Sequence, residues 1–171
     1  MKLSFFFFLL MTTLGLSSEA LSIGTLAPQV KALDQNGKAV SFADFYDKGI
    51  TLVYFYPKAD TPGCTAEACS LRDAYETLRD RDGKAIQILG VSRDKPEAQK
   101  KFQEKYRLPF TLIPDQDGTV AKDFGVTLIP LIGLTSRQSF LIKDGKISWS
   151  SLNAETSGAA QEVQKALNAL Q

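Results

Sequence analysis

The stretch ITLVYFY, from Ile50 to Tyr56, constrains the fold of this chain more than any other segment. It is apolar, β-branched and aromatic almost without interruption, a composition typical of a strand buried on both faces. A second run of this kind, AIQILGVS, extends from Ala85 to Ser92. Strands buried on both faces need helices to cover them, so we expect an α/β protein.

Helical periods follow each of these two strands. The first predicted helix begins at Thr65 and ends near Asp82–Gly83. Its apolar stripe consists of Ala68, Leu71, Tyr75 and Leu78. The second predicted helix is capped by Asp94 and carries Pro96 and Glu97 in its first turn. Its apolar face consists of Ala98, Phe102 and Tyr106.

The rest of the chain completes a mixed sheet. We expect a short strand at Phe110–Ile113, a short helix at Thr119–Phe124, and a hairpin that pairs Ser139–Ile142 with Lys146–Trp149. A last helix buries Val163, Ala166, Leu167 and Leu170. Strand–helix–strand, followed by a hairpin and a closing helix, implies an α/β fold with a mixed central sheet and helices on both faces. The thioredoxin-like architecture is the natural candidate.

Residues 1–20, MKLSFFFFLLMTTLGLSSEA, have the pattern of a signal peptide. One lysine precedes an apolar core from Phe5 to Leu16, which is shorter than the ~20 residues that span a bilayer. Ser18 and Ala20 place small residues where a signal peptidase reads, so we expect cleavage after Ala20 and an exported, periplasmic protein. An uncleaved membrane anchor and a buried N-terminal helix are the alternatives.

The charge balance argues against a nucleic-acid surface. The chain has 20 Lys and Arg against 19 Asp and Glu, a net charge of +1, and residues 21–171 keep this balance. Nucleic-acid binding needs clustered basic charge, whereas acidic and basic residues are interspersed here. With no repeat, low-complexity tract or long linker in the sequence, residues 21–171 are expected to form one compact soluble domain.

The two cysteines, Cys64 and Cys69, are the only thiols of the chain. In an exported protein such a pair is most often a structural disulfide. If both residues lie on one helix, however, their Cα atoms are roughly 8–9 Å apart, from a step of ~7.5 Å along the axis and a turn of ~140°. Disulfides join Cα atoms about 4.4–6.8 Å apart, so the bond does not form while the helix is intact.

Other roles for the thiols meet obstacles in the composition. The chain has no histidine, which excludes a Cys–His nucleophile and leaves a zinc site short of ligands. Cys64 and Cys69 are also too far apart in sequence for the C-x-x-C pair of a thioredoxin. We therefore expect no metal and no other cofactor.

Position can make one of the two thiols reactive. Cys64 follows Pro62-Gly63 and falls in the first turn of the predicted helix, where unpaired N–H groups and the helix dipole favour the thiolate. Cys69 lies a full turn further on, where the dipole acts weakly. The pattern thus indicates Cys64 as the nucleophile and Cys69 as the thiol that reacts later.

These residues resemble the active site of the peroxiredoxins, the alkyl hydroperoxide reductase and thiol-specific antioxidant superfamily. Pro57, Thr61 and Cys64 match its motif P-x-x-x-[TS]-x-x-C position for position. The stretch TPGCTAEAC is similar to that of the peroxiredoxin Q, or bacterioferritin comigratory, subfamily. The resemblance begins at Gly24 and continues through RQSFLI, which starts at Arg137 and resembles the strand that carries the active-site arginine of the family.

The resemblance implies an atypical two-cysteine peroxidase. Cys64 is the expected peroxidatic residue, which forms a sulfenic acid, and Cys69 the resolving residue, which closes a Cys64–Cys69 disulfide. Thr61 and Arg137 are expected to stabilise the charge that develops on the leaving oxygen. Pro57 is expected to shape the loop, and we expect Glu67 to orient an arginine.

Each supporting residue also has a plainer interpretation. Thr61 could be only a helix cap, Pro57 only a strand terminator and Arg137 only a surface charge. Phe55 and Trp149 are expected in the core or in the wall of a pocket. Many members of the subfamily have a histidine where this chain has Gln99, which leaves the role of that position open.

The expected substrates are hydrogen peroxide and organic hydroperoxides, which are reduced to water and alcohols in antioxidant defence and redox homeostasis. A thioredoxin-like protein or another thiol is the expected reductant, and the subfamily resemblance favours a monomer. We expect no stable membrane association after cleavage. Two alternatives remain: an exported thiol–disulfide oxidoreductase that acts on protein thiols, and a thioredoxin-like binding module with an inert disulfide.

Overall fold

The computed structural model describes residues 21–170, so the predicted signal segment lies outside the described residues. A five-stranded sheet has the order β5-β4-β3-β6-β7. Its strands are β3 (Thr51–Phe55), β4 (Gln87–Ser92), β5 (Thr111–Pro114), β6 (Gln138–Lys143) and β7 (Lys146–Ser151). The first three are parallel, and β6 and β7 are antiparallel to their neighbours, which confirms the expected mixed sheet.

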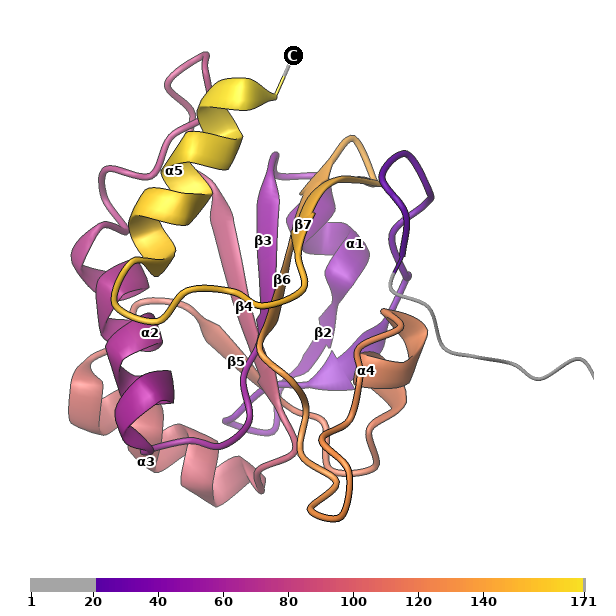
Figure 1. Ribbon diagram of the computed structural model, residues 1–171, viewed down its shortest axis with the longest axis vertical. Helices are drawn as coiled ribbons and strands as arrows, with labels where there is room; N and C mark the ends of the chain where they lie inside the picture. The colour runs from indigo at the N-terminus through magenta and orange to yellow at the C-terminus, as the bar shows by residue number, and fades with distance from the viewer. Residues whose placement is uncertain (1–20, 171) are drawn as a thin grey trace, which may run out of the picture.

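Helices cover both faces of this sheet (Figure 1). One face carries α2 (Pro62–Asp73), α3 (Pro96–Tyr106) and α5 (Ala159–Ala169), and the other carries α1 (Phe42–Tyr46) and α4 (Thr119–Asp123). No helix within residues 21–170 is both long and apolar enough to span a membrane.

The alternation of side chains along β3 divides the core in two. Leu52, Tyr54 and Tyr56 point to the face covered by α2, α3 and α5, where they pack with the thiol of Cys64. Val53 and Phe55 point to the opposite face and pack beneath α1 and α4. All residues of β3 are buried, as its composition predicts, because both faces are covered.

The first predicted helix is shorter than expected and begins earlier. It starts at Pro62, a residue suited to the first position of a helix, and ends at Asp73. Beyond it the chain forms a turn in which Thr77 donates from both its N–H and its hydroxyl to the carbonyl of Ala74. Leu78 is buried, as the apolar spacing predicts, although the helix ends before it.

The second predicted helix also differs at its start. Asp94 does not cap it, because Lys95 is the residue that precedes the helix and makes no side-chain cap. The Asp94 carboxylate instead accepts hydrogen bonds from the Ala59 N–H and the Ser92 hydroxyl. Ala98 is exposed, whereas Phe102 is buried as expected.

Sequence reasoning missed three short elements near the N-terminus. A two-stranded sheet pairs β1 (Lys31–Leu33) with β2 (Ala39–Ser41), and α1 follows directly. Each strand has only three residues and neither contains a fully buried one, so the pattern is too short to recognise.

The register of β3 and β6 determines where the site forms. Phe55 pairs with Gln138, so Arg137 lies beside the end of β3. The loop that begins at Pro57 leaves β3 at this same end and leads into α2. A motif from the middle of the chain and an arginine from its last third are thereby brought together.

Candidate active site

The loop between β3 and α2 is held in place by contacts of Ala59 and Asp60. Asp60 lies in the left-handed region, with φ of +59°, a conformation that aspartate tolerates better than most residues. Its carboxylate binds Lys105 Nζ at 2.8 Å and the Tyr106 hydroxyl at 2.7 Å. The preceding Ala59 N–H donates to Asp94 at 2.7 Å. These contacts fix the approach of the chain to α2.

Cys64 lies in the first turn of α2, as predicted. Cys64 is 2 % exposed and packs with the core residues beneath the helix. The first N–H groups of a helix have no partner within it, so this end carries a partial positive charge. A thiolate placed here is stabilised by the backbone.

Arg137 adds a full positive charge at the same sulfur. Its Nη2 donates to Cys64 Sγ at 3.4 Å, and its Nη1 donates to the Glu67 carboxylate. The Arg137 side chain is 15 % exposed, so it is not the solvated surface charge of the plainer interpretation. One guanidinium thus joins the Cys64 sulfur to the carboxyl group of Glu67, one turn further along α2.

Glu67 is buried behind this arginine, with 1 % of its side chain exposed. Burial raises the pKa of Glu67 to about 8, although the charge of Arg137 acts in the opposite direction. Its Oε1 atom has no hydrogen-bond partner among the described residues. The predicted role of Glu67, to orient an arginine, agrees with its contact with Arg137.

Gly63 leaves room for the guanidinium. A Cβ atom at this position would lie 3.3 Å from Arg137 Nη2 and 3.6 Å from Thr156 Cγ2. The first of these distances is tighter than an ordinary van der Waals contact, so with a side chain here the guanidinium would have to shift by a few tenths of an ångström. The glycine of the TPGC stretch therefore serves the approach of Arg137 to Cys64.

Thr61 and Pro57 occupy the loop in front of Cys64. Thr61 precedes the helix with extended dihedrals, but its side chain makes no helix cap. Its hydroxyl donates to the Lys58 carbonyl at 2.9 Å. A hydroxyl has one proton, so donation to a peroxide oxygen requires Thr61 to release Lys58, and that role stays a prediction. Pro57 is half-buried immediately after Tyr56.

Cys69 is half-buried on the same uninterrupted helix, and both thiols are free. The two cysteines therefore share a helix. Within residues 21–170, no group of three or more His, Cys, Asp or Glu side chains could hold a metal ion.

A buried tyrosine beneath α2 was not singled out from the sequence. Tyr54 is 1 % exposed, and its hydroxyl has no hydrogen-bond partner among the described residues. Burial raises the pKa of Tyr54 well above its usual value, and the nearby charges of Glu67 and Cys64 add to this. A Cβ at Gly90 would lie 2.7 Å from the Tyr54 hydroxyl, so this glycine makes room for it. The signal available in sequence was a glycine inside a buried strand.

Gln99 supports the loop from behind. It is fully buried, and its Nε2 donates to the Ser92 hydroxyl at 2.8 Å and to the Ile113 carbonyl at 2.9 Å. The Ser92 hydroxyl in turn donates to Asp94 at 2.7 Å, and Asp94 holds the Ala59 N–H. Gln99 is therefore part of a hydrogen-bonded chain that ends at the loop between β3 and α2.

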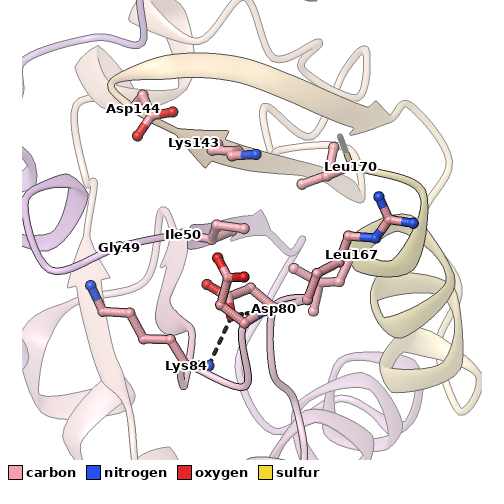
Figure 2. Close-up of a pocket in the computed structure, with 10 residues that line it drawn as sticks. Gly49, Ile50, Asp80, Lys84, Lys143, Asp144, Leu167 and Leu170 are labelled. Atoms are coloured by element: carbon pink, nitrogen blue, oxygen red, sulfur yellow. Dashed lines mark hydrogen bonds between the residues drawn. The ribbon is translucent and has the colours of Figure 1, made fainter.

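A cavity of about 380 Å³ lies at the other end of β3, away from Cys64 (Figure 2). Ile50, just before β3, lines it together with the ends of α5 and of the β6–β7 hairpin. Asp80 faces this cavity, but its carboxylate already accepts the backbone N–H groups of Asp82 and Lys84. None of the residues that form the Cys64 site lines this cavity.

Comparison with known proteins decides the family. The model of the AhpC/TSA family matches residues 23–150. The chain belongs to this family. Peroxiredoxin Bcp of Escherichia coli is 45 % identical over 133 residues, which cover 74 % of this chain and 83 % of that protein. Chloroplastic peroxiredoxin Q of Gentiana triflora is 39 % identical over 127 residues, which cover 74 % of this chain and 57 % of that protein.

Solved structures agree with this assignment. Peroxidoxin BcpB of Mycobacterium tuberculosis superimposes with a TM-score of 0.77 at 31 % identity, covering 87 % of this chain and 97 % of that one. Peroxiredoxin Q of Xanthomonas campestris gives 0.71 at 26 % identity, with 81 % and 89 % covered. The fold is thus the expected thioredoxin-like one, in a peroxiredoxin of the Bcp and peroxiredoxin Q type. The match spans less than three fifths of the length of the chloroplastic relative.

Proposed function

We propose that the protein is a thiol peroxidase that reduces hydrogen peroxide and organic hydroperoxides to water and alcohols. The observation that carries this proposal is the buried Cys64 sulfur in the first turn of α2, with Arg137 Nη2 at 3.4 Å. A related structure, of the Xanthomonas campestris bacterioferritin comigratory protein, concerns the alkyl peroxide reduction activity of that protein. Its 26 % identity and TM-score of 0.71 support the same chemistry here.

The first step oxidises Cys64. Its thiolate attacks one oxygen of the hydroperoxide, so that an S–O bond forms and the O–O bond breaks. Negative charge develops on the departing oxygen, which takes up a proton and leaves as water or alcohol. Arg137 and the N–H groups at the start of α2 lie beside the Cys64 sulfur and are the donors available to this oxygen; preorganised donors of this kind stabilise the transition state.

The second step converts the sulfenic acid of Cys64 into a disulfide. Cys69 attacks the sulfur of Cys64, so that an S–S bond forms, the S–O bond of the sulfenic acid breaks and water leaves. A thiol or a thioredoxin-like protein then reduces this intramolecular disulfide. Because both cysteines lie on one helix, the first turns of α2 must open before the sulfurs can bond.

The sequence of residues 1–20 supports an exported location, and the subfamily resemblance supports a monomer. We infer an exported protein, periplasmic or in an equivalent compartment, whose mature N-terminus is at or near Leu21 and which acts as a monomer. N-terminal sequencing of the native protein tests the cleavage and export, and sedimentation in solution tests the monomer. Intact Met1 in a cytosolic fraction, or a stable dimer, would overturn the corresponding inference.

Peroxide consumption with dithiothreitol as reductant tests the function itself. Cys64→Ser is expected to abolish turnover. Cys69→Ser is expected to complete one oxidation and to stop at the sulfenic acid or at a mixed disulfide with the reductant. The two variants are not equivalent, because the helix terminus and Arg137 act on Cys64. Equal peroxide reduction by both variants contradicts the assignment, and efficient exchange with peptide disulfides without peroxide turnover favours the oxidoreductase alternative.

A further inference from the structure

Cys69, the second cysteine, has Arg72 as a neighbour on α2. Cys69 and Arg72 are three residues apart on α2, a spacing that makes side chains neighbours on one helix face. Cys69 is half-buried and the Arg72 side chain is 31 % exposed, so both lie at the surface of the helix and not in the core. This pair is separate from the group that Cys64 forms with Arg137 and Glu67.

The Arg72 guanidinium contacts Tyr106 and Asp73, which lie outside the first turns of α2. Its Nη1 donates to the Tyr106 carbonyl at 2.8 Å, at the end of α3. Its Nε and Nη2 contact one Asp73 oxygen at 2.8 and 2.7 Å. The hydrogen bond with Asp73 raises the pKa of Arg72 most, and its charge and hydrogen-bond interactions with Cys69 add to this.

Tyr106 is itself anchored to the active-site loop. Its hydroxyl donates to Asp60 at 2.7 Å, and Lys105 binds the same carboxylate. The last turn of α3 therefore contacts the chain on both sides of Cys69, through Asp60 before α2 and through Arg72 near its end. The hydrogen bond between Arg72 and Tyr106 lies outside residues 62–69, the part of α2 that must open.

We propose that Arg72 is a positioning residue for the resolving step, which stabilises the thiolate of Cys69 as this thiolate attacks the sulfenic acid of Cys64. The inference rests on the proposed peroxidase function and deepens it. In this step an S–S bond forms between the two sulfurs, the S–O bond of Cys64 breaks, and the leaving hydroxide takes up a proton to become water. The thiolate is the nucleophile in such reactions, so a nearby cation increases the reactive fraction near neutral pH.

Other charges near Cys69 limit the size of the effect. Asp73 on α2 offsets part of the Arg72 charge, and Asp60 and Lys105 across from them are already paired with each other. The guanidinium is partly exposed, so solvent and salt screen it. We expect Arg72→Met to slow disulfide formation about threefold near neutral pH, the scale of an exposed charge pair.

Rapid quench after one equivalent of peroxide separates the two steps. Trapping and mass spectrometry then report Cys64 sulfenic acid and the Cys64–Cys69 disulfide at each pH. Arg72→Met is expected to form sulfenic acid at the wild-type rate and the disulfide more slowly, with the difference vanishing at high pH, where every thiol is ionised. Arg72→Lys should restore most of the rate. Arg79→Met, which removes an arginine of similar exposure from the turn after α2, is the matched control and should match wild type.

A second measurement does not need peroxide chemistry at all. In the Cys64→Ser protein, the alkylation rate of Cys69 with iodoacetamide should reach its plateau at higher pH when Arg72→Met is added. Slowing of disulfide formation by the same factor at every pH, without rescue by lysine, would instead mean that Arg72 only ties α2 to α3 and would overturn the proposal. An unshifted alkylation profile would overturn it as well. Failure of wild type to form sulfenic acid would refute the peroxidase function, and the alkylation result would still decide the role of Arg72.

Discussion

The Ser70 hydroxyl in α2 accepts a hydrogen bond from the Ala160 N–H in the first turn of α5, at 3.1 Å. Two residues further on, Arg72 donates to the Tyr106 carbonyl at the end of α3. The last turn of α2 is therefore tied to two neighbouring helices. In the first half of α2, Cys64 and Glu67 contact Arg137 instead. The two halves of the helix are held by different partners.

This division predicts where oxidation opens the helix. Disulfide formation should unwind residues 62–69 and leave Ser70 in contact with α5, because the strain of closing the bond is relieved before it reaches that contact. Amide hydrogen exchange on reduced and oxidised protein is expected to show loss of protection confined to residues 62–73, whose helical hydrogen bonds involve the opened turns. The Ala160 amide should stay protected in both states.

Ser70→Ala provides the control for this measurement. It should expose the Ala160 amide in the reduced and the oxidised protein alike, because the first N–H groups of α5 have no partner within that helix. If the disulfide is confirmed by mass spectrometry and protection of residues 62–73 is unchanged, the opening of α2 is refuted.

A second prediction concerns Arg137. Arg137→Met removes the cation at Cys64 and is expected to slow sulfenic acid formation by about a hundredfold or more, the usual effect of losing one preorganised donor. It also leaves the buried Glu67 carboxyl without its hydrogen-bond partner, which destabilises the fold by itself. Adding Glu67→Gln should recover stability but not the rate, as followed by thermal unfolding and rapid quench. Recovery of the rate in the double variant would show that Arg137 acts only through the fold.

A third prediction separates activity from stability at Gly63. Alanine is a better helix former than glycine by about 1 kcal/mol, so Gly63→Ala should leave the melting temperature unchanged or raise it. The new Cβ, 3.3 Å from Arg137 Nη2, should shift the guanidinium by a few tenths of an ångström and slow the reaction with peroxide several-fold. In the Arg137→Met background the same change is expected to have no further effect on the rate. Additive losses in the two backgrounds would contradict this coupling.

The sheet and the position of Cys64 at the start of a helix were predictable from sequence because each depends on local patterns. Strands that are buried on both faces are apolar throughout, and Pro62-Gly63 before Cys64 indicates a helix start. The extent of α2 was not predictable in this way. Its apolar spacing continues to Leu78, but the Ala74–Thr77 turn satisfies the backbone differently, so periodicity alone overestimates the helix.

Long-range contacts explain the rest of the difference. Asp94 has the residue type and position of a helix cap, but the N–H of Ala59 from another segment occupies its carboxylate. Burial of the Tyr54 hydroxyl beside Cys64 depends on the register of β3 and on the space left by Gly90. Gln99 reads as a departure from the family pattern, and only the fold shows that its amide is used by Ser92 and Ile113.

The last prediction concerns Glu67 and pH. Its pKa in the folded protein is about 8, above the ordinary value of 4.5, because burial disfavours the charged form. Between these two values the folded state holds a proton that the unfolded state has lost. The contribution of Glu67 to stability is therefore fully present below about pH 4.5 and is lost as the pH rises toward 8.

Glu67→Gln removes this titration and keeps a side chain of similar size. The free energy of unfolding, measured by denaturant titration from pH 5 to 8, should fall more steeply with pH in wild type than in the variant. The variant should also keep Arg137 near Cys64 less well, since an amide is a weaker partner than a carboxylate for a guanidinium. Sulfenic acid formation is thus expected to slow a few-fold above pH 8, where Glu67 is charged in wild type. Parallel pH profiles of stability in the two proteins would show that Glu67 is already ionised throughout this range and that its contact with Arg137 outweighs its burial.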